Sequence, residues 1–380
     1  MQTGKANEEL EQAMGRMSLR PRRGAVWLML IMMLAVAGCT GSASGGGGAS
    51  GDGAAQRPAA EFLAAYVRPD GRVARPDQGN DTVSEGQAYG LLLAEAAGEP
   101  AVFGRIWRWT SDHMQLASGL FGYHADAAGR LLSTQPAADA DLLIAWALLR
   151  YQGPDSAAWH QAGRRVAAAV LADEVTAGPD GMPVLTAGPW AMGRPASLDP
   201  SYWALPALTG LAGLTGDPRW QQLASAAVTL TSRLTDDGRE LPPDWAQLTA
   251  AGVLAPVPAP NSSEPQPEYG LDAQRTIAWF AVSCDPRARA LADRWWALLR
   301  RPGRAQALAL RLGGSVIDRE AAPLPLVAAA AAARAAGQQA VSRQLMQRAS
   351  AQQHSHPTYY GGAWAALGPV LFSGALTAAC

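Results

Sequence analysis

The sequence predicts an all-α domain built from paired helices. Segments rich in Ala, Leu and Trp recur with helical spacing from Pro58 onward, and stretches such as "GPD", "GDP" and "PPDW" separate them. Runs of strand-like alternation are scarce. With 380 residues, 48% of them hydrophobic, the chain has enough material for a sizeable core. Paired helices of this kind either close into a ring or stack as a solenoid.

The first 39 residues are typical of an export signal with a short N-terminal extension. A basic stretch at 17–23 precedes an apolar run at 25–35, and small residues lead to Cys39. This pattern resembles the lipobox of bacterial lipoproteins, in which the cysteine is lipidated. An ordinary secretory signal and an uncleaved anchor are the alternatives. Residues 1–16 are polar and do not suit a signal, so Met17 is an alternative start.

The signal predicts a periplasmic protein whose anchor in a bacterial membrane is its lipid alone. A secreted protein is the alternative. Thr40 after the cysteine favours the outer membrane. Residues 40–56 are rich in Gly, Ser and Ala and predict a flexible tether, so the folded domain is expected at 57–380. Beyond Cys39 only Cys284 and Cys380 remain, and a disulfide between them is not expected.

Charge and histidine content exclude some functions. Thirty-one basic residues nearly balance thirty-two acidic ones without forming a long stripe, so nucleic acid is not expected as a partner. The five histidines lack the spacing of metal ligands, and no metal site is predicted. Helices are predicted at 58–67, 84–98, 101–116, 140–152, 155–174, 201–214, 217–234, 271–283, 286–301, 323–336, 338–352 and 359–371.

Three of these helices open with acidic residues. In "TVSEGQAYGLLLAE", Ser84 is a candidate N-cap, Gly98 a candidate stop, and Glu85 falls in the first turn. Asp139 and Asp141 open the next such helix, and Asp272 opens a third. The helix dipole alone favours an acid there by about 0.3–1 kcal/mol. If the inner helices of a ring run in one direction, however, these carboxylates meet at one mouth and perturb one another.

Aromatic side chains accompany the acids. The chain has thirteen tryptophans against five phenylalanines, and indole and phenol rings suit the faces and hydroxyl rims of sugars as well as they suit a core. Candidates for sugar contacts are Tyr89, Trp107, Trp109, Trp146, Tyr202, Trp203 and Trp279. Acids and aromatics together favour a carbohydrate cleft.

The blocks "VSEGQAYGLLLAEAAGEPAVFGRIWRWTSDHM", "AADADLLIAWALL", "DPSYW", "LPPDW" and "YGLDAQRTIAWF" resemble glycoside hydrolase family 8 in order and spacing. This family includes bacterial endoglucanases encoded with cellulose synthase, so association with that machinery is a further expectation. The resemblance implies an (α/α)6 barrel with an open cleft at one end. It also implies an inverting endo-acting hydrolase of β-1,4-glucan that needs no cofactor.

The resemblance also assigns roles. It implies that Glu85 is the general acid, that Asp272 is the general base and that Asp139 holds the sugar at the cleavage subsite. Tyr202 and Arg275 match positions that help place the water and the base. Tyr89, Trp107, Trp109 and Asp141 are expected to contact substrate. Inversion requires a protonated acid and an ionised base, and Arg275 one turn after Asp272 favours its ionised form.

Three positions depart from the family pattern: Ala138 replaces the more usual Ser or Thr, Asp199 replaces Asn, and Leu271 replaces Tyr. Whether Tyr269 supplies the missing aromatic is left open. Xylan, mixed-linkage glucan and chitosan are alternative polymers, since a pocket change of about 1–3 kcal/mol shifts preference. A non-catalytic glucan-binding lipoprotein and a solenoid assembly partner are alternatives from other classes, although the repeat of about 34–45 residues that a solenoid needs is not found.

Overall fold

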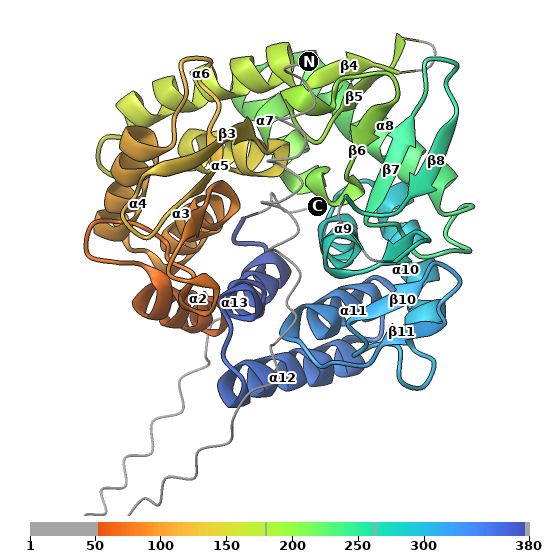
Figure 1. Cartoon of the computed structure of the whole chain (residues 1–380). Helices are drawn as coiled ribbons and strands as arrows, with labels where there is room; N and C mark the ends of the chain where they lie inside the picture. Colours follow the sequence, from red (N-terminus) through yellow and green to blue (C-terminus); the bar gives the residue numbers. More distant parts are fainter. Residues whose placement is uncertain (1–51, 179–180, 261, 263, 377–380) are drawn as a thin grey trace, which may run out of the picture.

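A computed structural model describes residues 52–178, 181–260, 262 and 264–376. Within them the helices form two concentric rings (Figure 1). The outer ring consists of α2 (Asp52–Tyr66), α4 (Pro100–His113), α6 (Ser156–Asp173), α8 (Pro218–Leu234), α10 (Pro286–Leu299) and α12 (Gln339–Ser355). The inner ring consists of α3 (Ser84–Ala97), α5 (Ala138–Arg150), α7 (Leu205–Thr215), α9 (Leu271–Ala281), α11 (Pro323–Ala335) and α13 (Tyr359–Ser373).

Burial explains which helices lie inside. Helices α3, α5, α9 and α11 are buried on nearly all sides, whereas outer helices such as α8 and α10 bury only one face. The ring closes because α13 packs against both α2 and α3. The hydroxyl of Tyr66 also donates to the carbonyl of Thr358 at 2.8 Å. The fold is therefore the predicted (α/α)6 barrel, and the solenoid alternative is wrong.

Short antiparallel strands connect the helix pairs and were not anticipated. In the part of the chain that the structure describes, they form four small sheets: β1 (Thr82–Val83) with β2 (Gly122–Ala125) and β3 (Leu131–Pro136); β4 (Val175–Ala177) with β5 (Pro183–Leu185); β6 (Ala196–Leu198) with β7 (Trp245–Leu248) and β8 (Leu254–Val257); and β9 (Glu268–Tyr269) with β10 (Ala309–Arg311) and β11 (Val316–Asp318). Strands β1 and β9 lead directly into α3 and α9.

The first described helix starts earlier than expected. It begins at Asp52, inside the segment 40–56 predicted as a tether, because Ala-rich sequence favours a helix and Ala55 is buried in the core. The signal, Cys39 and residues 40–51 lie outside the described residues. None of the described helices combines the length and hydropathy needed to cross a membrane.

The expectation that the chain forms no disulfide at Cys284 is wrong, because Cys284 takes part in a disulfide. Cys39 and Cys380, the other cysteines of the chain, both lie outside the described residues.

Candidate active site

Glu85 lies at the mouth of the barrel, in the first turn of α3. The N-cap of this helix is Val83, without a side-chain hydrogen bond, so the prediction that Ser84 caps the helix is wrong. Ser84 is instead the first helical residue, buried beside Glu85. Gly98 ends the helix in the left-handed conformation, as predicted.

Gly86 explains why a glycine follows the acid. A Cβ atom at this position would lie 2.4 Å from the hydroxyl oxygen of Tyr359. A side chain at this position would displace that hydroxyl, so the glycine makes room for Tyr359 beside Glu85. Tyr359 and Tyr360, at the start of α13, line the same cavity as Glu85.

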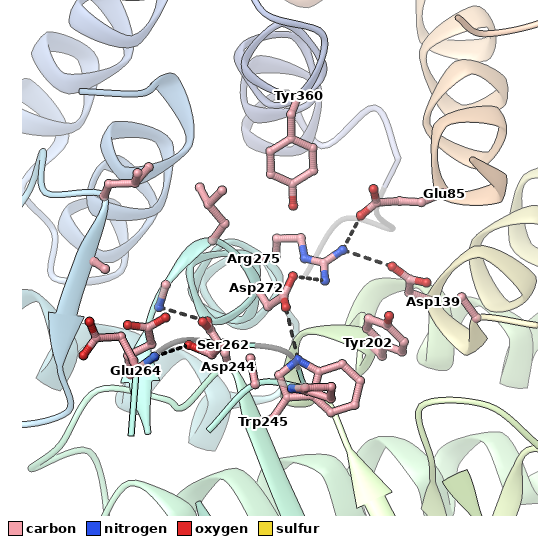
Figure 2. Close-up of a pocket in the computed structure, with 18 of the residues that line it drawn as sticks. Glu85, Asp139, Tyr202, Asp244, Trp245, Ser262, Glu264, Asp272, Arg275 and Tyr360 are labelled. Atoms are coloured by element: carbon pink, nitrogen blue, oxygen red, sulfur yellow. Dashed lines mark hydrogen bonds and ion pairs between the residues drawn. The ribbon is translucent and has the colours of Figure 1, made fainter. Parts of the chain in front are cut away.

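Arg275, on α9, contacts all three predicted carboxylates and so connects them (Figure 2). Its Nη1 donates to Glu85 and, at 3.0 Å, to Asp139 Oδ2. Its Nη2 donates to Asp272 Oδ1 at 2.9 Å. The N-termini of α3, α5 and α9 thus meet at one end of the barrel, which confirms the expectation of a shared mouth.

Glu85 is held in an environment that favours its protonated form. Its side chain is only 4% exposed, and burial raises its pKa to about 7. Arg275 opposes this rise, whereas the negative charge of Asp139 adds to it. Tyr89 donates a hydrogen bond from its hydroxyl to Glu85 Oε1 at 2.8 Å. A carboxyl group with this pKa can donate a proton near neutral pH.

Asp139 is the second buried carboxylate. Its side chain is 7% exposed, and its Oδ1 accepts the backbone N–H of Ala140 at 2.8 Å. Burial raises its pKa, while Arg275 counteracts the rise. Both oxygens have protein partners, so the side chain is held in one position where it lines the cavity.

Asp272 is the most accessible of the three, with 30% of its side chain exposed. Trp245 donates from its indole N–H to Asp272 Oδ2 at 3.3 Å. The carboxylate is thus oriented by one indole and one guanidinium while its remaining surface faces the cavity. A carboxylate held in this way can accept a proton from a water molecule.

Asp244 fixes the start of the helix that carries Asp272. Its Oδ1 accepts the backbone N–H groups of Gly270 at 2.9 Å and Ala273 at 2.7 Å. A Cβ atom at Gly270 would lie 2.4 Å from Asp244 Oδ2, so this glycine is required for the contact. The "LPPDW" block therefore supplies two side chains to this region: Asp244, which accepts N–H groups at the start of α9, and Trp245, which donates to Asp272.

The cavity that these residues line has a volume of about 470 Å³. Its walls combine carboxylates with aromatic rings, as a sugar-binding cleft requires. Within the described residues, no group of His, Cys, Asp and Glu is arranged to hold a metal ion.

A model of the family described as glycosyl hydrolases family 8 matches residues 50–369. The chain belongs to glycosyl hydrolase family 8. A probable endoglucanase from Novacetimonas hansenii is 32% identical over 260 residues, which cover 62% of this chain and 70% of that protein. An endoglucanase from Cellulomonas uda is 30% identical over 251 residues, which cover 64% of this chain and 68% of that protein.

Solved structures of glucanases share the fold. The endo-β-1,4-glucanase CMCax from Acetobacter xylinum matches with a TM-score of 0.69 and 29% identity, over 85% of this chain and 98% of that one. A β-1,3-1,4-glucanase from Paenibacillus sp. X4 reaches a TM-score of 0.75 at 19% identity, over 85% and 92% of the two chains. This second likeness concerns the barrel alone.

Some of the site residues predicted from sequence lie at the cavity, and others do not. Glu85, Asp139, Tyr202, Asp272 and Arg275 line the cavity, with the Arg275 guanidinium carbon 5.4 Å from the centre of the Tyr202 ring. Tyr89 is buried and reaches the site only through its hydroxyl.

Trp107, Trp109 and Asp141 do not line the cavity, which corrects their expected role in substrate binding. Both indoles are buried in the core around α4, where Trp109 stacks on His113. Asp141 is fully buried, and its Oδ1 accepts the N–H of Phe121 at 2.8 Å. Trp146, Trp203 and Trp279 are core residues as well.

Sequence reasoning missed several residues that line the cavity, namely Arg75, Tyr123, Asp244, Trp245, Tyr359 and Tyr360. The aromatic partner of Asp272 is Trp245, whereas Tyr269 is buried and outside the cavity. Two signals pointed to some of them: the "LPPDW" block and the paired tyrosines that open α13.

Proposed function

We propose that this family 8 member cleaves β-1,4-linked glucan within the polymer chain and inverts the anomeric configuration, with Glu85 as general acid and Asp272 as general base. The observation that carries the proposal is that Glu85 and Asp272, which both contact the guanidinium of Arg275, differ in their environments. Glu85 is buried, with its pKa raised to about 7 by burial, whereas Asp272 is partly exposed and hydrogen-bonded by Trp245.

Each residue has one part in the reaction. Glu85 protonates the oxygen of the leaving sugar, and Asp272 takes a proton from the water that attacks from the opposite face. Asp139 accepts a hydrogen bond from a hydroxyl of the sugar at the cleavage point. Arg275 and Trp245 keep Asp272 oriented, and Tyr202 helps to place the water. The water oxygen forms a bond to the anomeric carbon as the bond from that carbon to the leaving oxygen breaks. One proton moves from Glu85 to the leaving oxygen, and another moves from the water to Asp272.

The choice of polymer rests on the relatives. Those from Novacetimonas hansenii and Cellulomonas uda are both endoglucanases by name, and CMCax is an endo-β-1,4-glucanase. We expect the protein to lower the viscosity of carboxymethylcellulose well before many reducing ends accumulate, because an endo-acting enzyme cuts long chains internally. A parallel panel with xylan, mixed-linkage glucan and chitosan tests the choice. A protein that binds these polymers but releases no reducing ends would contradict the proposal.

We further propose that the chain is exported and anchored through a lipid on Cys39. The disulfide at Cys284 supports an oxidising compartment such as the periplasm. Association with a cellulose synthase complex stays a prediction of the family resemblance.

Replacing Cys39 with Ser should move the protein from the membrane fraction to the soluble fraction or leave an unprocessed precursor. Fractionation followed by immunoblotting measures this. A processed variant that remains in the membrane fraction would exclude the lipid anchor.

A further inference from the structure

Three Asp-Pro pairs in the described chain begin helices in the same way. Asp199 begins the short 3-10 helix Pro200–Tyr202, Asp217 begins α8, and Asp285 begins α10. Each aspartate uses Oδ1 to accept the backbone N–H two positions later, at 2.8, 2.9 and 2.8 Å respectively. These contacts are ordinary N-caps.

The second carboxylate oxygen distinguishes Asp199 from the other two. In Asp217 and Asp285 it pairs with the arginine two positions later, Arg219 at 2.6 Å and Arg287 at 2.7 Å. The residue two positions after Asp199 is Ser201, which has no guanidinium. Asp199 Oδ2 lies instead 3.5 Å from Arg275 Nη2, and the Asp199 side chain is completely buried.

Arg275 therefore faces carboxylates on both of its edges. Nη1 contacts Glu85 and Asp139, whereas Nη2 contacts Asp272 and Asp199. We propose that Asp199 is a positioning residue: it holds Nη2 on the Asp272 side of the site and thereby limits the ion pair between Arg275 and Glu85. The proposal rests on the roles of Glu85 and Asp272 given above.

Removing the charge of Asp199 should strengthen the interaction between Arg275 and the ionised form of Glu85. The pKa of Glu85 should then fall. Burial and the charge of Asp272 raise the pKa of Asp199, and Arg275 opposes this rise. The charge of Asp199 is therefore greatest on the alkaline side of the pH profile, where Glu85 also titrates. The other groups facing Asp199 are Ser201, Tyr202 and Asp272. Those facing Glu85 are Tyr89, Tyr123, Asp139, Asp272, Tyr359 and Tyr360.

The test is the pH profile of Asp199→Asn on a soluble β-1,4-glucan. The amide keeps the cap acceptor and the shape but removes the charge. We expect the basic limb of kcat/KM to move to lower pH by about half a unit to one unit. The matched control is Asp217→Asn, which alters the same kind of cap on α8 and should leave the profile unchanged.

An unchanged basic limb in Asp199→Asn, or an equal shift in Asp217→Asn, would overturn the proposal. If Asp199→Asn does not fold, Asp199→Ser provides the same test, because a serine hydroxyl still caps the helix without charge. Failure of the proposed function looks different, since the unaltered protein would then not hydrolyse glucan at any pH, and the proposal would fall with it.

Discussion

Replacing Glu85 with Gln should reduce kcat on β-1,4-glucan by about a thousandfold while oligosaccharide binding is retained. An amide fills the space of the carboxyl group and can still contact Tyr89 and Arg275, but it has no acidic proton to give to the leaving oxygen. Reducing-end assays measure the loss, and calorimetry with cello-oligosaccharides measures binding. The basic limb of the pH profile should disappear together with the acid. Near-normal turnover would mean that another group is the acid.

A variant on the same helix separates chemistry from packing. Glu95 also pairs with an arginine, Arg150, at 3.0 Å, but near the opposite end of α3. Glu95→Gln should weaken the fold without changing kcat.

The stability of Glu85→Gln and that of the unaltered protein should also depend differently on pH. The folded pKa of Glu85, about 7, lies above the ordinary value of 4.5. Its protonated form therefore stabilises the fold fully below 4.5, and this contribution is lost as the pH rises through about 7. Denaturant unfolding at pH 5 and pH 8 should show a smaller difference for Glu85→Gln than for the unaltered protein.

The second large effect is expected for Asp272. Asp272→Asn should lower kcat by about 10²- to 10⁴-fold, because the amide cannot take a proton from the attacking water. Glu85 can still protonate the leaving group in this variant, so an activated β-linked donor should not restore activity. An α-glycosyl fluoride with an acceptor sugar should instead support glycosyl transfer. The acidic limb of the pH profile should be lost, in contrast to Glu85→Gln.

The stereochemistry of the unaltered enzyme checks the same assignment. If Asp272 activates water without bonding to the sugar, proton NMR should detect the α-anomer first in fresh cleavage of a β-1,4-glucan. Initial β-anomer would assign Asp272 as a nucleophile. Asp285→Asn, which alters an exposed helix cap on α10, is the control for the loss of an aspartate charge and should keep full activity.

Local sequence signals predicted most of the fold. Gly98 and the Pro residues that open α4, α8 and α10 mark helix ends through their own backbone preferences, so the boundaries were found to within a few residues. The strands were missed because segments of two to six residues, such as β1 and β3, are too short to show alternation.

The candidate site was predicted less evenly. Glu85, Asp139 and Asp272 were found because each lies in the first turn of an inner helix, which is a local feature. The roles of Trp245 and Tyr359 depend on which segments the closed ring brings together. Which aromatic residues are buried could not be predicted either. A helical tryptophan such as Trp107, which is buried in the core, has the same sequence pattern as one that lines a cleft.

The closure of the ring by α13 makes the cavity depend on segments from opposite ends of the described chain. Tyr66 and Thr358, which bond across the seam, are 292 positions apart in the chain. Tyr359 and Tyr360 belong to the last described helix, so a chain without α13 lacks one wall of its cavity. A chain cut short before α13 should therefore be inactive even with all its carboxylates present.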